Sequence, residues 1–540
     1  MMGFTISRII SRAWGHVALS VLIGIGLVSL IAPSCAFAAT SVPFTINMSE
    51  AVTVTGTPRI AVDVGGVTRY ATYTSGSGSA ALVFTYAMVA GDVDLDGVSL
   101  SSPIDLNGGT ITDLNGNPQT DLTFTVPNTS GVKIDYPSLS MDFIYDADGR
   151  YTLNGTAYND LTSFLGASGG TFSRASIGTY FDSSGTLQTA SSGTPRFDHD
   201  PITHAPKGIL IEEARTNLLQ YSGNIGMGNW AIDGGCSTLV ADATTAPDGS
   251  NNASRIIYSC GGARKTQSIT VSTITPLTFS IFLKPSSSNN GSRLLVYNNT
   301  TTTSLGSINI PSLLSGGTAY ANGWRRYSLT VSSGWISGNS LRFYVYTDSS
   351  GGAIVGNDLY VWGAQVEAGS FPTSYIPTTT AAVTRAADNL TVPTASWYNA
   401  SSGSLYAEAD TMPYNGSLSG AISIAFFNDV TTNNEWGLRF DAGGTNTASP
   451  YVAGGVNQTT IYTLPVLSGI NKTVHAMSSN TRSTVGNGGT VRTGTYSSPP
   501  AITTLDIGKK YPSSYLNGWI QRAKYYPARV SDTQLQLMTQ

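Results

Sequence analysis

Short segments in which apolar and polar residues alternate, separated by turn residues, constrain the fold of this chain more than any other feature. Clear examples are Ile60–Val64 and Ala81–Tyr86, and Gly65-Gly66 and Gly76-Ser77-Gly78 are typical turns between such segments. A period of two is typical of half-buried strands, and strands about 8–12 residues apart are typical of a β-sandwich. The sequence therefore predicts an all-β fold of tandem β-sandwiches with little helix.

The scarcity of charged side chains supports this fold class. Charged residues make up 11% of the chain, against about 25% in a typical soluble domain. Helices draw on Lys, Glu and Arg, which are scarce here. Because 41% of the residues are hydrophobic and 27 are Tyr, packed cores can form and disorder is not expected. A formal net charge of −4 without a Lys/Arg cluster argues against a nucleic-acid partner.

Residues 1–38 have the pattern of a secretory signal peptide. Two arginines precede the apolar run Val17–Ile31, and small residues place the cleavage site between Ala38 and Ala39. An uncleaved membrane anchor is the alternative, although the apolar run is short for a membrane span. We expect a chain that is secreted or held at the bacterial cell surface, without a stable membrane span after cleavage.

Two cysteines, Cys236 and Cys260, remain after that cleavage. In an exported chain a pair of cysteines indicates one disulfide. Two unpaired buried thiols are the alternative.

The first unit, residues 39–130, contains the strings "TVTGTPRIAVDVGGVTRY" and "NGGTITDLNGN". These strings resemble the Ig-like repeat of large bacterial surface and adhesin-type proteins. The resemblance implies a β-sandwich used for display at a surface.

The middle of the chain resembles phage-type modules. In residues 131–218 the strings "FSRASIGTYFDSSGTLQTA", "PRFDHDP" and "GILIEEARTNLL" resemble a connector of phage tail and head-fibre proteins. Residues 219–390 contain "LYVWGAQVEAGSFPTSYIPTTTAAVTRAADNL" and resemble a carbohydrate-binding-module-like jelly roll with a galactose-binding-like fold.

Residues 391–540 resemble the laminin-G-like, concanavalin A-type lectin fold. The strings that carry this resemblance are "GSLYAEADTM" and "LNGWIQRAKYYPARVSDTQLQLM". The resemblance implies a short helical turn after the closing strand, and Ser531 is a suitable cap for it.

A calcium loop is one interpretation of Asp92, Asp94 and Asp96. The three carboxylates stand at alternate positions and are followed by Gly97, as at the start of an EF-hand loop. Pro103 occupies the position of the bidentate Glu, and no helical flanks are evident. The motif is therefore not an EF-hand, and two interpretations remain, a structural calcium ion in a partial site and an Asp-rich turn without metal. No other cofactor is expected.

A second metal motif is formed by Asp198, His199, Asp200 and His204, whose spacing could chelate a divalent ion. A solvated loop is the favoured interpretation, since neighbouring prolines mark a turn.

Catalysis is poorly supported. Glycan hydrolysis needs a pair of carboxylates about 5–10 Å apart. Glu408 and Asp410 begin a strand pattern known from glycanases of the concanavalin type, but Pro413 replaces the second Glu, and Glu435 is the other Glu of this unit. We therefore expect no enzyme, with a polysaccharide hydrolase or lyase as the least favoured alternative.

Sugar binding needs aromatic faces and a few polar groups. We expect Trp335, Trp436 and Tyr451 to contact sugar from loops, and we assign Trp324 and Trp362 to the core. The sequence thus predicts a non-catalytic exported glycan-binding or adhesion protein whose partner is a polysaccharide or cell-surface glycan. The alternative is a structural fibre or spacer of phage-tail type, and either form could assemble as a homo-oligomer.

Overall fold

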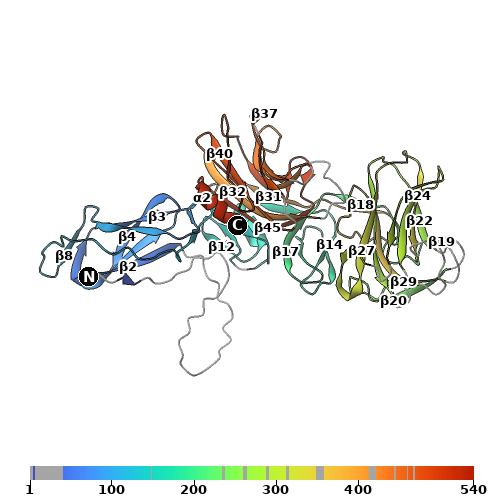
Figure 1. Ribbon diagram of the computed structural model, residues 1–540, viewed down its shortest axis with the longest axis horizontal. Helices are drawn as coiled ribbons and strands as arrows, with labels where there is room; N and C mark the ends of the chain where they lie inside the picture. Colours follow the sequence, from blue (N-terminus) through green and yellow to red (C-terminus); the bar gives the residue numbers. More distant parts are fainter. Residues whose placement is uncertain are drawn as a thin grey trace, which may run out of the picture.

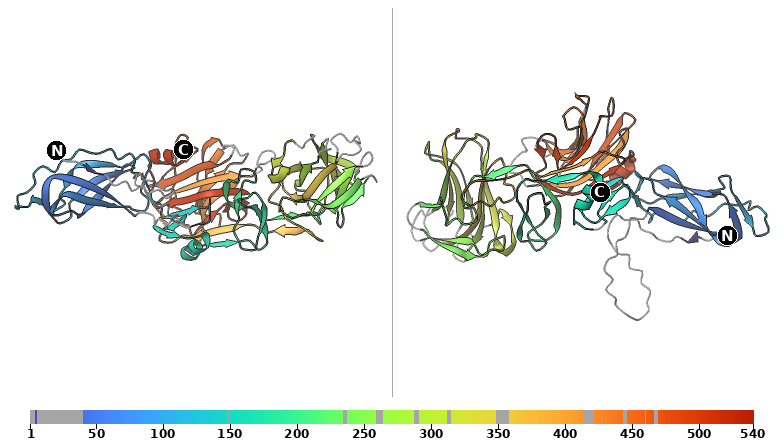
Figure 2. Two further views of the ribbon diagram at one scale, coloured as in Figure 1. Left: turned by 90° about the horizontal axis from the view of Figure 1, so that it is seen from below. Right: turned by 180° about the vertical axis from the view of Figure 1, so that it is seen from behind.

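Three β-lobes follow one another along the long axis of the molecule (Figures 1 and 2). The computed structural model describes residues 4–5, 40–147, 149–233, 237–258, 264–286, 291–311, 315–347, 358–412, 421–442, 446–458, 460–465 and 469–540. The predicted cleavage site at Ala38 and Ala39 and the predicted disulfide between Cys236 and Cys260 lie outside these residues. Within the described ranges, no helix combines the length and apolar character needed to cross a membrane. The all-β prediction is confirmed.

The N-terminal lobe is built on one long strand that serves two sets of partners. Strand β2 (Ser41–Thr55) pairs with β5 (Ser79–Ala87) through its first part and with β8 (Thr110–Asp113) through its last part. The other strands are β1 (Phe4–Thr5), β3 (Arg59–Val64), β4 (Val67–Ser75), β6 (Val93–Asp94), β7 (Ser99–Asp105) and β9 (Ile134–Asp135). Every second residue from Val42 to Met48 is buried, as the alternating pattern requires.

The lobe farthest from the N-terminal lobe is a sandwich of two antiparallel sheets. The β22 sheet contains, in order, β19 (Ala231–Asp233), β22 (Arg264–Thr270), β28 (Ser340–Tyr346), β24 (Ser292–Asn298) and β25 (Thr303–Ile310). The β29 sheet contains β20 (Ser237–Thr244), β21 (Ala253–Tyr258), β29 (Asp358–Ala368), β23 (Leu277–Pro285), β27 (Arg325–Val331) and β26 (Thr318–Ala319), followed in the chain by η2 (Ala321–Gly323) before β27. Phe279 and Phe343 meet edge to face between the sheets, with ring centroids 5.5 Å apart.

The central lobe is also a sandwich of two sheets. The β45 sheet contains β12 (Thr156–Tyr158), β11 (Tyr151–Leu153), β10 (Leu139–Asp142), β45 (Gly518–Tyr526), β32 (Ser402–Thr411), β39 (Asn471–Ser478), β40 (Thr481–Gly486) and β41 (Arg492–Thr495), with β17 (Pro206–Ile211) and β16 (Phe197–His199) attached. The β33 sheet contains β13 (Thr171–Ser173), β31 (Asn389–Pro393), β42 (Thr504–Ile507), β33 (Ile422–Asn428), β34 (Glu435–Phe440), β35 (Asn446–Ser449) and β38 (Ile461–Pro465), with β36 (Tyr451–Ala453) and β37 (Val456–Asn457) attached.

Residues 131–218 do not form a separate connector, which revises the domain boundaries expected from the sequence. Strand β10 pairs with β45, and β13 pairs with β31, so this segment completes both sheets of the central lobe. The lobe made of the β22 and β29 sheets, called the inserted lobe below, lies between the two halves of the central lobe in the chain. Where the chain enters and leaves the insert, β18 (Arg215–Asn217) pairs with β30 (Val383–Arg385).

The remaining elements are short. Hairpins are formed by β14 (Gly178–Phe181) with β15 (Leu187–Ala190) and by β43 (Lys509–Lys510) with β44 (Ser514–Tyr515). Helix α1 (Leu161–Ser168) is capped by Asp160. Helix α2 (Asp532–Met538) follows the closing strand, as the lectin resemblance implies, but the Ser531 hydroxyl donates to the Gly65 carbonyl at 3.0 Å instead of capping the helix.

A buried ionic cluster joins the two halves of the central lobe. Arg174 pairs with Asp388 at 2.9 Å, and Arg196 pairs with Glu212 at 2.7 Å. Arg385 lies 3.4 Å from Glu212, and all five side chains are essentially inaccessible to solvent. Burial by itself raises the pKa of Glu212, but the Arg385 and Arg196 guanidinium groups outweigh it and lower the pKa to about 2.

Candidate functional site

The outer face of the β22 sheet carries cationic and aromatic side chains. In β28, alternate residues such as Phe343 and Val345 point into the core, and Arg342, Tyr344 and Tyr346 point to the opposite face. This separation follows from the period of two in a strand. One face of the strand thus packs the core, and on the opposite face Arg342 is partly exposed while Tyr344 and Tyr346 are buried, at 5% and 8% exposure.

Strand register brings matching side chains together on this outer face. Arg264 of β22 and Arg293 of β24 lie on either side of Tyr346, and Thr266 lies beside Tyr344. Directly opposed residues have their Cβ atoms about 5 Å apart. The face is therefore a continuous array, not a set of scattered residues.

The guanidinium groups lie over the tyrosine rings. The Arg264 guanidinium carbon is 5.1 Å from the ring centroid of Tyr344 and 5.5 Å from that of Tyr346, and the Arg342 guanidinium is 5.9 Å from Tyr344. Cation–π contacts of this kind hold both partners in place. Asp233 contacts Arg264 at 2.9 Å and Arg342 at 3.4 Å. Burial by itself lowers the pKa of Arg264, but the hydrogen bond to Asp233 outweighs it and raises the pKa.

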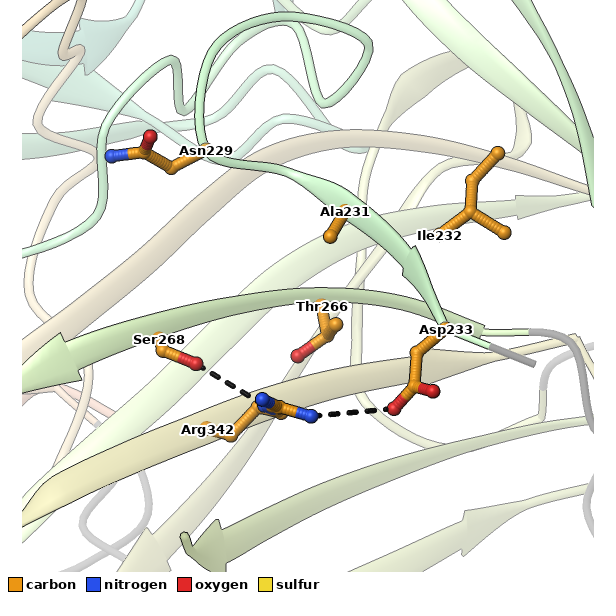
Figure 3. A pocket seen from close by; sticks show the side chains of 7 residues that line it. All are labelled: Asn229, Ala231, Ile232, Asp233, Thr266, Ser268 and Arg342. Atoms are coloured by element: carbon orange, nitrogen blue, oxygen red, sulfur yellow. Dashed lines mark hydrogen bonds and ion pairs between the residues drawn. The ribbon is translucent and has the colours of Figure 1, made fainter. Parts of the chain in front are cut away.

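A recess of about 430 Å³ opens beside this array (Figure 3). Figure 3 shows Arg342 between Ser268 and Asp233, with Thr266 above it. The Arg342 Nε atom donates to the Ser268 hydroxyl at 3.2 Å. The recess is lined by Asn229, Ala231, Ile232, Asp233, Thr266, Ser268 and Arg342.

The Thr266 hydroxyl adds an unsatisfied polar group to the recess. It is buried and has no hydrogen-bond partner among the described residues. A buried hydroxyl without a partner costs free energy, and a ligand that exchanges a hydrogen bond with it would remove that cost. The recess thus offers hydroxyl, amide, carboxylate and guanidinium groups to a ligand.

All three aromatic residues expected to contact sugar from loops are instead buried. Trp335 is 7% exposed, and its indole nitrogen donates to the Thr273 carbonyl at 2.9 Å. Trp436 is fully buried, and its ring lies 4.6 Å from that of Phe427. Tyr451 is buried as well. The assignment of Trp324 and Trp362 to the core is confirmed.

A signal for the candidate face is present in the sequence of β28. "SLRFYVY" alternates between core residues and the set Arg342, Tyr344 and Tyr346. Tryptophans in predicted loops therefore do not mark this face, which regular strands present. The contributions of Arg264 and Asp233 depend on the pairing of strands that are not neighbours in sequence.

The three aspartates of the expected calcium loop do not converge on one point. Asp92 pairs with Arg69 at 2.6 Å, and Asp94 accepts from the backbone nitrogens of Gly65 and Gly97 at 2.7 and 2.6 Å. In the described part of the chain, no cluster of three His, Cys, Asp or Glu side chains is arranged to hold a metal. The turn does need its glycine, since Gly97 has φ of 110°.

Asp96 instead connects the N-terminal lobe to helix α2. Its carboxylate accepts from the Gln534 side chain at 2.6 Å, and this hydrogen bond lowers the pKa of Asp96. The Oε1 atom of the same Gln534 side chain accepts a hydrogen bond from the Leu95 backbone nitrogen at 2.7 Å. The Asp-rich turn is therefore a contact between lobes.

Two of the three carboxylates considered for catalysis, Glu408 and Glu435, are paired with cations. Glu408 binds Arg522 at 2.5 Å and accepts from the Tyr406 hydroxyl at 2.6 Å. Glu435 binds Lys510 at 2.7 Å. Glu408 and Glu435 belong to different sheets and are both buried.

Two residues of the second motif considered for metal, which the sequence favoured as a solvated loop, are engaged by other groups. Asp198 accepts from the indole nitrogen of Trp519 at 2.7 Å, and the Nδ1 atom of His199 lies 3.2 Å from the Phe181 carbonyl. Asp198, His199 and Asp200 line a second recess, between the inserted lobe and the central lobe.

Comparison with known proteins gives no family. No protein-family model and no curated protein matches the chain. The CBM40 of the Ruminococcus gnavus IT-sialidase bound to α2,3-sialyllactose aligns with 26% of this chain and 84% of its own (13% identity, TM-score 0.23). The CBM22 tandem of Paenibacillus barcinonensis Xyn10C aligns with 59% of this chain and 99% of its own (9% identity, TM-score 0.22). Mouse laminin α1 domains LG4-5 align with 55% of this chain and 89% of their own (11% identity, TM-score 0.19). With TM-scores this low, these likenesses carry no conclusion about function.

Proposed function

We propose that the chain is an exported, non-catalytic protein that binds acidic glycans on the outer face of the β22 sheet. The observation that carries the proposal is the recess in which Arg342, Asp233 and the unpartnered Thr266 hydroxyl lie together. Sugar hydroxyls both donate and accept hydrogen bonds, so they suit a recess that offers hydroxyl, amide and charged groups in a small volume.

The charge of the face favours an acidic sugar. Arg264, Arg293 and Arg342 lie on this face with Asp233, although the chain as a whole has a formal net charge of −4. Guanidinium groups bind carboxylates with two parallel hydrogen bonds. The Ser268 and Tyr344 hydroxyls hold Arg342 at 3.2 and 3.3 Å, and its contact to Asp233 is long, at 3.4 Å, so the carboxylate of a uronic or other acidic sugar can replace Asp233 as its acceptor.

Binding at a shallow face of this kind is expected to be weak for a single unit, about millimolar to micromolar, and to strengthen when several copies bind one polymer. Display at the bacterial cell surface and assembly as a homo-oligomer would both serve that purpose. Immunodetection on intact cells tests the display, and exclusively cytoplasmic protein would contradict it.

A glycan array probed with the whole chain tests the binding proposal. Signal on carboxylated glycans, reduced when salt is raised, is the expected result because charge-assisted contacts weaken at high ionic strength. Absence of signal on every carboxylated glycan would overturn the proposal.

A structural spacer is the second candidate, and the continuous row of lobes favours it. The β18–β30 ribbon and the contact between Asp96 and Gln534 tie successive lobes together. A regular oligomer seen by light scattering, with no affinity for any glycan, would support this function instead.

A further inference from the structure

A second cavity lies where the inserted lobe meets the central lobe. Its volume is about 550 Å³, within the range of about 300–1,000 Å³ that small-molecule sites occupy. Figure 1 shows β14 and β17 next to the lobe that contains β27. The walls come from residues 179–210, from β26 and β27, from residues 372–375, and from Met412 and Trp519 of the central lobe.

Lys207 presents an ammonium group to this cavity without an acceptor of its own. Its Nζ atom lies 3.1 Å from the ring centroid of Trp519. Among the described residues no hydrogen-bond acceptor is assigned to this nitrogen and no carboxylate lies within 4.0 Å of it. Burial lowers the pKa of Lys207, while Asp198, Asp410 and Asp200 oppose that effect. A ligand oxygen at this position would satisfy the ammonium group.

One carboxylate on the same wall, that of Asp200, is available to accept from a ligand. Asp200 accepts hydrogen bonds from the backbone nitrogens of Ile202 and Thr203 at 2.9 and 2.7 Å. Burial by itself raises the pKa of Asp200, but these hydrogen bonds outweigh it and lower the pKa. A carboxylate oxygen has further lone pairs. The cavity can therefore donate from Lys207 and accept at Asp200.

Aromatic rings supply an apolar surface on the cavity wall. The rings of Phe181 and Tyr320 lie 5.0 Å apart at 35°, and Phe282 lies 5.0 Å from Tyr320. Phe181 and Tyr320 are half-buried, so part of each ring is open. Pyranose rings pack their C–H faces on such surfaces, and their hydroxyls need the polar groups beside them.

We propose that this cavity binds a neutral mono- or disaccharide, with Lys207 donating to a ring or hydroxyl oxygen and Phe181 and Tyr320 contacting the sugar face. A neutral ligand fits because Asp198 and Asp200 offset the positive charges of Lys207 and Arg326. The site is distinct from the Arg342 face and does not depend on it. Since both lobes contribute walls, a bound sugar also ties the inserted lobe to the central lobe.

Saturation-transfer NMR on the whole chain with maltose, cellobiose and lactose tests the site. At least one disaccharide is expected to receive saturation. Lys207→Met keeps an unbranched chain over Trp519 but removes the donor, and binding should weaken about tenfold, the order contributed by a hydrogen bond to a charged group. Lys133→Met, at an exposed position in the N-terminal lobe, is the matched control and should bind as the wild type.

Thr318→Trp provides a test that does not disturb a buried residue. Thr318 lines the cavity and is exposed, so a larger side chain there should obstruct the site while leaving the fold intact. Arg342→Met should leave disaccharide binding unchanged, which separates this site from the acidic-glycan face. The proposal would be overturned if the wild-type chain saturated none of the disaccharides. It would also be overturned if folded Lys207→Met and Thr318→Trp saturated a disaccharide as strongly as the wild type does.

Discussion

Arg174 and Asp388 stand 214 positions apart in the chain and form an ion pair of 2.9 Å with both side chains inaccessible to solvent. The whole inserted lobe lies between them in sequence. The strings that resemble a phage connector supply three members of this cluster, namely Arg174, Arg196 and Glu212, and Asp388 comes from the string that closes residues 219–390. These motifs therefore close the central lobe around its insert.

Breaking the Arg174–Asp388 pair should strongly destabilise the protein. Asp388→Asn leaves the guanidinium group of Arg174 buried without its counter-charge, while Arg196 keeps Glu212, and the loss of a buried counter-charge costs about 3–5 kcal/mol. Urea unfolding at neutral pH checks this. Asp105→Asn, which removes an exposed pair with Arg59, is the control and should have little effect. Equal stability of the two variants would show that the cluster does not hold the lobe together.

Acid should destabilise the protein through Glu212. Its pKa is about 2 in the folded chain and about 4.3 in an unfolded one. A lowered pKa contributes stability above the unfolded value, and this contribution is lost as the pH falls from about 4.3 toward 2. Unfolding free energies measured between pH 5 and pH 3 should fall less steeply for Glu212→Gln than for the wild type. Parallel curves would contradict this assignment.

His475 should make stability depend on pH in a higher window. The ring is fully buried, its edge faces Trp436 at 5.3 Å, and burial lowers its pKa to about 3. Because the unfolded pKa is about 6.5, stability is lost as the pH falls from 6.5 toward 3, by about 1.4 kcal/mol between pH 7.5 and 5.5. His475→Phe keeps a planar ring and should lack this component in urea unfolding. An unchanged difference between the two pH values would assign the effect to other groups.

The amide of Gln534 should hold the N-terminal lobe against the central lobe. Gln534→Ala removes hydrogen bonds to Asp96 and Leu95, so small-angle X-ray scattering should show a larger radius of gyration. Gln536→Ala, on the same helix, is the control.

A chelator such as EGTA should leave the melting temperature unchanged, since Asp92, Asp94 and Asp96 are engaged with other groups. A lower melting temperature in EGTA would restore the calcium interpretation.

Alternation in the sequence predicts the strands well where one face of a sheet is buried. Val42 to Met48 and β28 follow the period of two closely. The central lobe could not be predicted in this way. Ser138 and Tyr525, 387 positions apart, are hydrogen-bonded, and strands of three or four residues carry too little periodicity to reveal such partners.

The position of the candidate site was not predicted from the sequence. Trp335 follows a Ser-Ser-Gly segment typical of an exposed loop, yet it lies at 7% exposure against the sandwich core. Local sequence cannot show that a loop folds back over a core. Arg342 and Asp233 become neighbours only when β19, β22 and β28 pair, which is information about tertiary structure.

Titration of an acidic oligosaccharide into the whole chain is the most direct test of the proposed function. Oligogalacturonate and its neutral methyl ester form a matched pair of ligands, and Arg342→Met and Arg492→Met form a matched pair of variants, since Arg492 is exposed on β41 in a different lobe. Calorimetry should show that oligogalacturonate binds the wild type and Arg492→Met with the same affinity. Its affinity for Arg342→Met should be at least about tenfold lower. The wild type should bind oligogalacturonate more tightly than the methyl ester. Equal affinity of Arg342→Met and the wild type, or no preference for the carboxylate, would contradict the account.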